Sequence, residues 1–194
     1  RTIFQAAMRP SWSIATLAHG QPRFRGFEKY MGKRGLTEAA SFIGTQLGTL
    51  DWDYLHAVRE EWSGPVMVKG ILDPQDAVRA VDDYGMDGVV VSNHGGRQFD
   101  GAPAAIDALP AVASAMKGKG PVVFDSGVRS GLDIMRARAL GADFVMLGRA
   151  FMFGVAALGA RGGDHVADIL IEDLKSHMLN LGCTRFDELS GRLI

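Results

Sequence analysis

Four short polar segments carry the side chains that could do chemistry in this chain of 194 residues. Each segment directly follows a short apolar run: Lys69, then Ser92-Asn93-His94-Gly95-Gly96-Arg97, then Asp125-Ser126-Gly127-Val128-Arg129, and last Gly148-Arg149. An imidazole that titrates near neutral pH suits proton abstraction, and a guanidinium suits a carboxylate or a phosphate. A lysine at the end of an apolar strand is rare unless it faces a ligand, because burying an unpaired ammonium is costly. The segments together predict a ligand site.

Each of these residues also has a structural explanation when it is taken alone. Lys69 could extend to solvent, His94 could be a hydrogen-bonded loop histidine, and Arg97 could be an exposed partner in an ion pair. The functional interpretation therefore depends on all four segments standing at strand ends, where parallel α/β folds place their working groups.

The third and fourth segments have the composition of an anion site. Residues 127–131 open a predicted helix, so we expect backbone N–H groups, the helix N-terminus and Arg129 to point at one place. The pair Gly148-Arg149 adds a second glycine and a second guanidinium from the next strand. Two converging arginines suit a phosphate dianion, and a (β/α)8 barrel forms its phosphate site after its last two strands.

The elements that must position these residues repeat four times from Gly64 onward. Short, continuously apolar runs predict buried parallel strands at 66–69, 89–92, 122–125 and 144–148. Start and stop signals predict helices from Pro74 with Asp73 as the N-cap, over about 103–116, from about 131 to 140 with Gly141 behind it, and over 164–181. The spacing suits βα repeats with right-handed crossovers.

The fold class expected is therefore α/β, the C-terminal half of a (β/α)8 barrel, containing strands 5–8 with flanking helices. Residues 1–50 are expected to form a helical and loop segment, with a helix over about 3–17 and a loop to Gly35. A helix over 52–61 with Asp51 as its N-cap follows. Residues 51–194 are expected to hold the four units, the C-terminal helix and the phosphate site, in one domain that a missing N-terminal half completes.

Composition narrows the classes further. With 47% apolar and 22% charged residues the chain is globular, and its single cysteine, Cys183, excludes an internal disulfide and a multi-cysteine metal site. No metal and no membrane-spanning helix are expected. Residues 1–35 contain seven basic residues and one acidic residue among aromatic ones, which suits an anionic membrane surface or a solvated basic face. Nucleic-acid binding has little support elsewhere in the chain.

The string Ser92-Asn93-His94-Gly95-Gly96-Arg97-Gln98 closely resembles the FMN-dependent α-hydroxy acid dehydrogenase/oxidase family (glycolate oxidase, L-lactate dehydrogenase and mandelate dehydrogenase). The segments Val68-Lys69-Gly70, residues 125–131 and Gly148-Arg149 match the same family. The histidine string is highly specific, whereas the phosphate motif is shared more widely among phosphate-binding barrels. The resemblance covers about residues 50–192 and, more loosely, the rest.

The resemblance implies FMN as the cofactor and the oxidation of an L-2-hydroxy acid to the 2-oxo acid. It implies that His94 is the general base and that Arg97 binds the substrate carboxylate. It also implies a cofactor site in which Lys69 and Ser92 meet the flavin ring and Asp125 holds the ribityl chain. The other cofactor residues, which lie in the phosphate segments, are Ser126, Gly127, Val128, Arg129, Gly148 and Arg149.

The first half of the family barrel has no match in this chain. That half carries the active-site tyrosines, a second substrate arginine and the aspartate that orients the catalytic histidine. We therefore expect a separate chain, the N-terminal half of the same enzyme, as a partner, with this chain starting after the family's mobile loop behind strand 4. A deliberately made half-barrel is the competing explanation. By resemblance the assembly is a homotetramer in the cytoplasm, with peripheral contact to the inner face of the membrane through residues 1–35.

Two other functions stay open at this point. One is a different FMN barrel of the inosine monophosphate dehydrogenase or isopentenyl diphosphate isomerase kind, although Cys183 lies far from the loop that would need a nucleophile. The other is an inactive half-barrel that binds only a phosphate ligand or a partner through its open strand edges. The particular hydroxy acid, the electron acceptor, and the choice between a carbanion and a hydride mechanism are also open.

Overall fold

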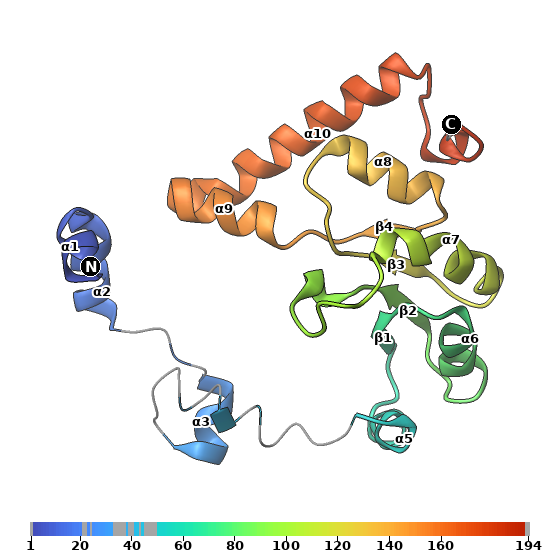
Figure 1. Ribbon diagram of the computed structural model, residues 1–194, viewed down its shortest axis with the longest axis horizontal. Coiled ribbons are helices and arrows are strands. Elements are labelled where there is room, and N and C mark those ends of the chain that lie inside the picture. Colours follow the sequence, from blue (N-terminus) through green and yellow to red (C-terminus); the bar gives the residue numbers. More distant parts are fainter. Residues whose placement is uncertain are drawn as a thin grey trace. The chain divides into compact units, whose positions relative to one another are not determined.

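The computed structural model describes residues 2–20, 23, 25–32, 38, 41–42, 44 and 50–192 (Figure 1). The chain divides into two compact units, residues 1–54 and 55–194, and each is described by itself. The first unit contains α1 (Thr2–Ala7), α2 (Pro10–His19) and α3 (Arg25–Met31). Helix α5 (Trp52–Glu61) crosses the boundary between the units. The division into segments 1–50 and 51–194 of one completed domain stays a prediction.

The helix expected over about 3–17 is two helices, because Pro10 interrupts it. Proline lacks an N–H and disfavours the helical conformation in the residue before it, and Arg9 has φ −131° and ψ 66°. Helix α3 occupies part of the stretch expected to be a loop, and its Glu28 pairs with Arg23 at 2.7 Å. The residues at 33–37 of that loop lie outside the described residues. The helix expected over 52–61 is confirmed, and Asp51 accepts the N–H of Tyr54 at 2.9 Å.

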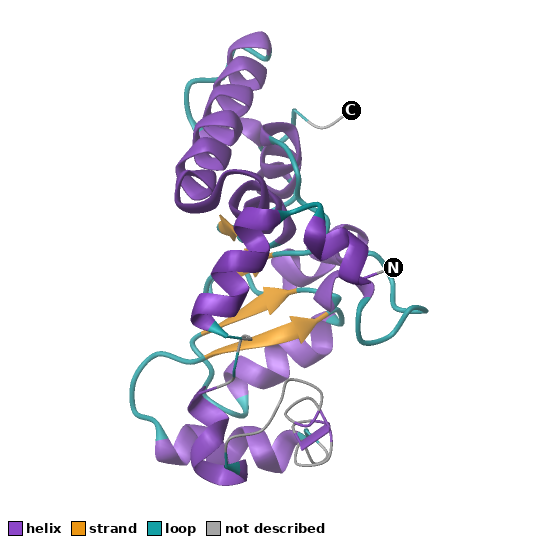
Figure 2. Ribbon diagram, turned by 90° about the vertical axis from the view of Figure 1, so that its left-hand side faces the viewer, coloured by secondary structure: helices purple, strands orange, loops and turns teal. Residues whose placement is uncertain are grey.

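The second unit contains one parallel sheet of four strands in the order of the sequence. Its strands are β1 (Met67–Ile71), β2 (Gly88–Val91), β3 (Val122–Phe124) and β4 (Phe144–Val145). Helices α6 (Pro74–Asp82), α7 (Ala105–Ala115) and α8 (Gly131–Ala139) follow the first three strands. Figure 2 shows the strand arrows pointing in a common direction. Four consecutive parallel βα units form a partial (β/α)8 barrel, so the predicted fold class is confirmed.

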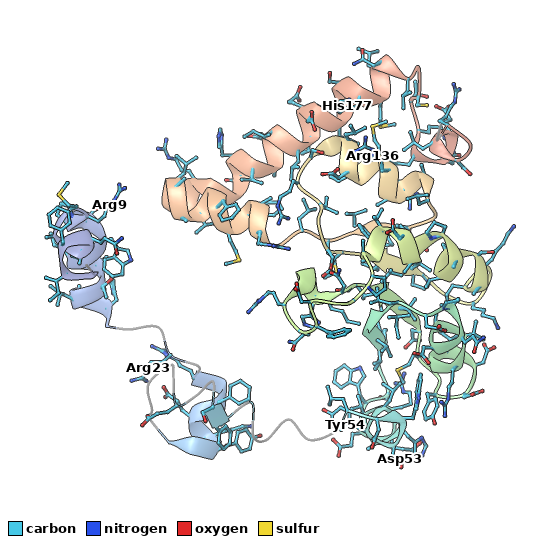
Figure 3. All side chains as sticks on the ribbon, viewed as in Figure 1. Arg9, Arg23, Asp53, Tyr54, Arg136 and His177 are labelled. Atoms are coloured by element: carbon cyan, nitrogen blue, oxygen red, sulfur yellow. The ribbon has the colours of Figure 1, made fainter. Side chains whose placement is uncertain are left out.

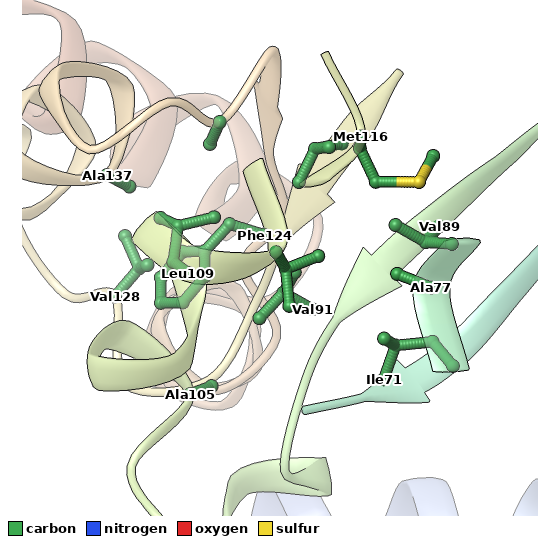
Figure 4. Packing of buried hydrophobic residues seen from close by; sticks show 13 residues of the cluster. Ile71, Ala77, Val89, Val91, Ala105, Leu109, Met116, Phe124, Val128 and Ala137 are labelled. Carbon is green, nitrogen blue, oxygen red and sulfur yellow. The ribbon is translucent and has the colours of Figure 1, made fainter. Parts of the chain in front are cut away.

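The core lies between the sheet and its helices. All four residues of β2 are buried, as expected for a parallel strand covered on both faces. Figure 4 shows Leu109 of α7 packed with Phe124 of β3 and Val128. Full burial of a leucine or phenylalanine side chain stabilises the fold by about 1.5–3 kcal/mol. The edge strand β4 differs, since Phe144 is 66% exposed.

Local signals define the ends of the helices as expected. Asp73 accepts the N–H groups of Gln75 and Asp76 at 2.7 and 3.3 Å, and Pro74 takes the first helical position of α6. Ser130 and Asp133 form a reciprocal capping box at the start of α8. Gly141 follows α8 with φ 105°, a conformation that favours glycine.

The C-terminal part contains one helix that the sequence did not predict, α9 (Arg149–Leu158), and the expected α10 (Gly162–Asn180). No side chain caps the N-terminus of helix α9, and its polar residues do not recur at a helical spacing. The sequence therefore lacks the local features that predict the other helices. The two helices approach closely at glycines, because a Cβ on Gly154 would lie 2.6 Å from the Gly162 carbonyl oxygen. Cys183 is buried against Met135 and Leu189, as expected for a structural thiol. No helix in the described ranges is long and apolar enough to cross a membrane.

Candidate active site

Strand β1 and the residues that directly follow β2 and β3 bring four of the predicted residues into direct contact. Lys69 lies within β1 and not at its end as expected, because the strand continues to Ile71. The ammonium of Lys69 lies 2.8 Å from Asp125 Oδ2 and donates a hydrogen bond to Ser92 Oγ at 2.9 Å. Ser126 donates to Asp125 Oδ1 at 2.9 Å. Ser92 is buried, and Lys69 and Asp125 are partly exposed. Parallel strands end at one edge of the sheet, which is why residues so far apart in sequence meet here.

Asp125 is held in its charged form by this network. Burial raises the pKa of Asp125, but hydrogen bonds from Lys69, Ser92 and Ser126, together with the charge of Lys69, lower it more. The net effect is a pKa below the ordinary range of an aspartate. The charge pair therefore persists at neutral pH. An ammonium has three donors, and Asp125 and Ser92 use two, so Lys69 keeps one donor for a ligand.

The His94 turn, residues 92–97, sits directly on this network. His94, Gly95 and Gly96 form the short 3-10 turn η1 with φ 58°, 68° and 74°, three consecutive left-handed residues. The His94 N–H donates to Ser92 Oγ at 3.0 Å. The imidazole of His94 and the guanidinium of Arg97 are exposed, and neither has a hydrogen-bond or ion-pair partner among the described residues. The structure thus fixes the backbone of the turn and leaves both side chains available to a ligand.

Beyond β3 the chain opens a small cavity of about 240 Å³ whose lining includes Phe124, Ser126, Gly127, Val128 and Arg136. Arg136 projects from α8 and is labelled in Figure 3. Gly127 has φ 95°, and a Cβ there would meet nothing within 4 Å. The backbone at this position therefore faces open space, and the one cation of the lining, Arg136, lies 3.7 Å from the carboxylate of Asp133 in the same lining.

The sequence predicted that the N-terminal amides of α8 help to bind an anion. In the structure these amides already donate hydrogen bonds to carboxylate side chains of the protein. The N–H groups of Arg129 and Ser130 donate to Asp133 Oδ2 at 3.0 and 3.1 Å. The N–H of Gly131 donates to Asp173 of α10 at 2.6 Å. The spacing of Ser130 and Asp133 signals the capping box, whereas nothing local in sequence signals Asp173.

Helix α9 offers the free helix start instead. Gly148 is its N-cap and supplies no side-chain bond to the first amides, and Arg149 is the first helical residue. The Arg149 guanidinium donates to the Gly95 carbonyl oxygen at 3.5 Å, and a Cβ on Gly95 would lie 2.6 Å from its Nη2. Arg129 is exposed and its Nη1 donates to the Val128 carbonyl oxygen at 2.8 Å. Two guanidiniums thus flank the strand ends.

Asn93 is a further residue of the turn, to which the sequence alone assigned no role. Its Oδ1 accepts the Gly95 N–H at 3.0 Å, and its Nδ2 donates to the Pro103 carbonyl oxygen at 3.2 Å. Asparagine is a common turn residue because its side chain accepts the backbone N–H two residues further on, as it does here. Within the described residues, no cluster of three or more His, Cys, Asp or Glu side chains could hold a metal ion.

Four parallel βα units with polar residues at and beyond the strands, among them a lysine, a loop histidine and two arginines, define the class of this structure as one half of a (β/α)8 barrel. A family model described as FMN-dependent dehydrogenase matches residues 1–194. The chain belongs to this family, and FMN is the cofactor on which the family depends. The family resemblance, the half-barrel fold and the cofactor expected from the sequence are therefore confirmed.

Individual relatives agree with this assignment. The L-lactate dehydrogenase of Acinetobacter baylyi is 42% identical over 193 residues, covering 98% of this chain and 50% of that protein. The L-lactate dehydrogenase of Alcaligenes faecalis is 41% identical over 197 residues, covering 100% of this chain and 52% of that protein. The chain spans about half the length of the curated relatives it matches.

Two solved structures match the fold of this chain over part of their own length. A crystal structure of the monotopic membrane protein (S)-mandelate dehydrogenase matches 98% of this chain and 50% of its own, with a TM-score of 0.89 and 35% identity. A structure of mandelate oxidase matches 80% of this chain and 45% of its own, with a TM-score of 0.73 and 39% identity. The order and direction of the four βα units are therefore those of the family barrel.

Proposed function

We propose that this chain supplies the cofactor-binding and proton-abstracting half of an enzyme that oxidises an L-2-hydroxy acid to the 2-oxo acid. The observation that carries the proposal is the contact of Lys69, Ser92 and Asp125 directly beneath the His94 turn. The relatives named L-lactate dehydrogenase and (S)-mandelate dehydrogenase act, by their names, on acids of this class. The complete reaction belongs to the assembled barrel, in which the N-terminal half comes from a partner chain and the assembly is a tetramer.

The residues present fit FMN. The open backbone at Gly127, the uncapped start of α9 at Gly148 and the exposed Arg129 and Arg149 suit a phosphate dianion. Ser126 and Val128 supply backbone to the same segment. Asp125 suits a polyol chain, because a carboxylate held in its charged form accepts hydrogen bonds from hydroxyl groups. Lys69 and Ser92, joined at 2.9 Å, would face the ring edge.

The oxidation would use two exposed side chains, those of His94 and Arg97, together with the hydrogen-bond network around Lys69. FMN, when bound, would accept the two electrons that leave the hydroxy acid, and the substrate hydrogen that His94 does not take would pass to FMN or to water. Arg97 binds the substrate carboxylate through two parallel N–H bonds and so fixes which hydrogen faces the base. His94 takes one proton from the substrate, for which an imidazole is suited near neutral pH. The remaining donor of Lys69 offers positive charge where negative charge accumulates on the ring edge.

The test uses the full enzyme that contains this half. With His94→Gln, turnover of L-lactate and (S)-mandelate should fall by roughly 10²-fold or more, while the visible flavin band remains. Loss of the flavin band instead would mean that His94 serves cofactor binding. Intact mass spectrometry of the same sample shows whether the N-terminal half is a separate polypeptide. One chain without flavin and without turnover would favour the inactive half-barrel.

We also propose peripheral membrane contact through residues 1–35. On α1, α2 and the turn between them six large apolar side chains are exposed: Ile3, Phe4, Met8, Trp12, Ile14 and Leu17. Arg9 lies between the two helices, and apolar side chains beside basic ones suit an anionic lipid surface. The full enzyme should sediment with phosphatidylglycerol vesicles and not with phosphatidylcholine vesicles, and Trp12→Ser with Leu17→Gln should abolish sedimentation. Equal sedimentation with both lipids would contradict a charge-dependent contact.

A further inference from the structure

Ser126 has a backbone conformation that does not favour a side chain. Its φ is 87°, in the left-handed region where only glycine is free of strain. His94 at φ 58° is the other non-glycine residue with positive φ in the described ranges. Strain of this kind persists only where the surroundings hold it in place. The two strained residues belong to adjacent strand ends, so their contacts bear on the same site.

The Ser126 hydroxyl is fully used by the protein. Its oxygen accepts the Asn93 N–H at 3.2 Å and the Gly95 N–H at 3.1 Å. It donates its hydrogen to Asp125 Oδ1 at 2.9 Å. A hydroxyl has one donor and two acceptor sites, so no capacity is left for a cofactor. The side chain of Ser126 therefore acts within the protein, while its backbone remains part of the proposed cofactor segment.

Two hydroxyls divide the amides of the His94 turn between them. Ser92 Oγ accepts the N–H of His94, and Ser126 Oγ accepts the N–H groups on either side of it, at Asn93 and Gly95. Three consecutive amides of a left-handed turn are thus held by side chains rather than by regular secondary structure. Asp125 orients the arrangement, because a charged carboxylate accepts the hydroxyl hydrogen and turns the lone pairs of Ser126 toward the amides.

We propose that Ser126 is a positioning residue whose hydroxyl pins the backbone on both sides of His94 and so sets where the imidazole stands. This inference rests on the proposed function, in which His94 removes the substrate proton. Glycine at position 126 would relax the backbone, yet it would leave the Asn93 N–H without its acceptor and the Gly95 N–H with Asn93 Oδ1 alone. The strained backbone of Ser126 is thus tolerated because the Ser126 hydroxyl orders the neighbouring His94 turn. The effect of Ser126 on the reaction is indirect, through the position of His94.

The test compares Ser126→Ala and Ser126→Gly in the full, flavin-loaded enzyme. Alanine removes the hydroxyl and keeps the strained backbone, whereas glycine removes both. If the hydroxyl pins the turn, both variants should exchange the Asn93 amide hydrogen about tenfold faster or more, measured by mass spectrometry on the peptide that covers 92–97. The Gly95 amide should accelerate less, because Asn93 Oδ1 still accepts it. Both should lose about tenfold in kcat at unchanged flavin content, since two neutral hydrogen bonds are lost.

Ser130→Ala is the matched control. Ser130 also accepts one backbone N–H, that of Asp133 at 3.1 Å, but it lies at the start of α8 and makes no hydrogen bond to the turn. This variant should lower the melting temperature and leave the exchange of the Asn93 and Gly95 amides at the native rate. Equal acceleration of those amides in the control would show general loosening and overturn the proposal.

Two further results would also overturn the inference about Ser126. One is native exchange rates at Asn93 and Gly95 in Ser126→Ala. The other is native kcat in Ser126→Gly with reduced kcat in Ser126→Ala, because that pattern assigns the effect to backbone strain. Failure of the proposed function is a separate result: an enzyme with native Ser126 that oxidises no 2-hydroxy acid. In that case amide exchange still decides whether Ser126 holds the turn.

Discussion

The ammonium of Lys69 lies 2.8 Å from the carboxylate of Asp125, although strand β2 separates their two strands. Next-nearest strands in a sheet are roughly 10 Å apart, so neither side chain would reach the other alone. The long lysine stem crosses the end of β2, where it also donates to Ser92 at 2.9 Å. This one contact ties three βα units together at the edge that carries the candidate site.

Removal of the Lys69 charge should change how stability depends on pH. Because the folded pKa of Asp125 is lowered, its contribution is fully present above the unfolded value of about 4 and is lost as pH falls through the folded value. Lys69→Met should therefore melt below the native protein at about pH 7, and the difference should shrink toward about pH 3. Melting curves at several pH values test this, with the exposed Lys117→Met as the charge control. A gap that widens in acid would contradict the pairing.

Arg97 should govern substrate affinity rather than stability. Its side chain is exposed and has no hydrogen-bond or ion-pair partner within the described ranges, so its removal costs the fold little. Arg97→Lys keeps the charge but loses the bidentate geometry, and we expect kcat/KM for a 2-hydroxy acid to fall by roughly 10–100-fold with an unchanged melting temperature. Steady-state kinetics of the full enzyme measure this. Arg161→Lys, an exposed change in the turn before α10, should leave kcat/KM at the native value.

Two glycines on the packed helices should respond in opposite directions to alanine. A Cβ on Gly131 would lie 2.2 Å from the backbone nitrogen of Leu174, so Gly131→Ala must push α8 away from α10. Overpacking of this kind costs about 1–3 kcal/mol. A Cβ on Gly163, at the start of α10, meets nothing within 4 Å, and Gly163→Ala should stabilise by up to about 1 kcal/mol. Denaturant unfolding of both variants gives the comparison, and equal stabilities would contradict the close approach.

The N-cap of α6 should be worth a measurable part of the stability. Asp73 accepts two backbone N–H groups, and Asp73→Ala should cost about 1 kcal/mol in the free energy of unfolding. Asp76→Ala removes the same charge from the first turn without removing the cap. Chemical denaturation should show the loss mainly in Asp73→Ala. Similar losses in both variants would assign the effect to the helix dipole instead.

Elements with strong local signals were predictable. The four apolar runs each overlap the observed strand, although β1 ends two residues later and β2 begins one residue earlier than expected. The Asp73-Pro74 pair and the capping box at Ser130 mark helix starts because they satisfy amides within one turn. Helix α9 was not predictable, since all its residues after Arg149 are apolar or glycine and its N-cap is Gly148. Its start is decided by the strand before it and by packing at Gly154 and Gly162.

The candidate site was predictable as a set of residues and not as a set of contacts. The histidine string identifies the family, and the alternation of strand and polar turn predicts Lys69, Ser92 and Asp125 at strand ends. Ser92 and Asp125 directly follow their strands, whereas Lys69 lies within β1. By contrast, the occupation of the α8 amides by Asp133 and Asp173 reverses a local expectation. The Asp173 contact spans 42 positions in the chain, and no pattern of nearby residues encodes it.

The sequence by itself determined the α/β class, the order of the units and the family of this protein. The spacing of apolar residues, the residues of turns and the caps of helices all depend on residues that are close in the chain. The motif that identifies the family is likewise a continuous stretch of sequence. Only the tertiary structure decided that Lys69 pairs with Asp125 and that the Ser126 hydroxyl holds the amides around His94. These contacts arise because parallel strands end at one edge, and the distance across that edge depends on how the whole sheet and its helices pack.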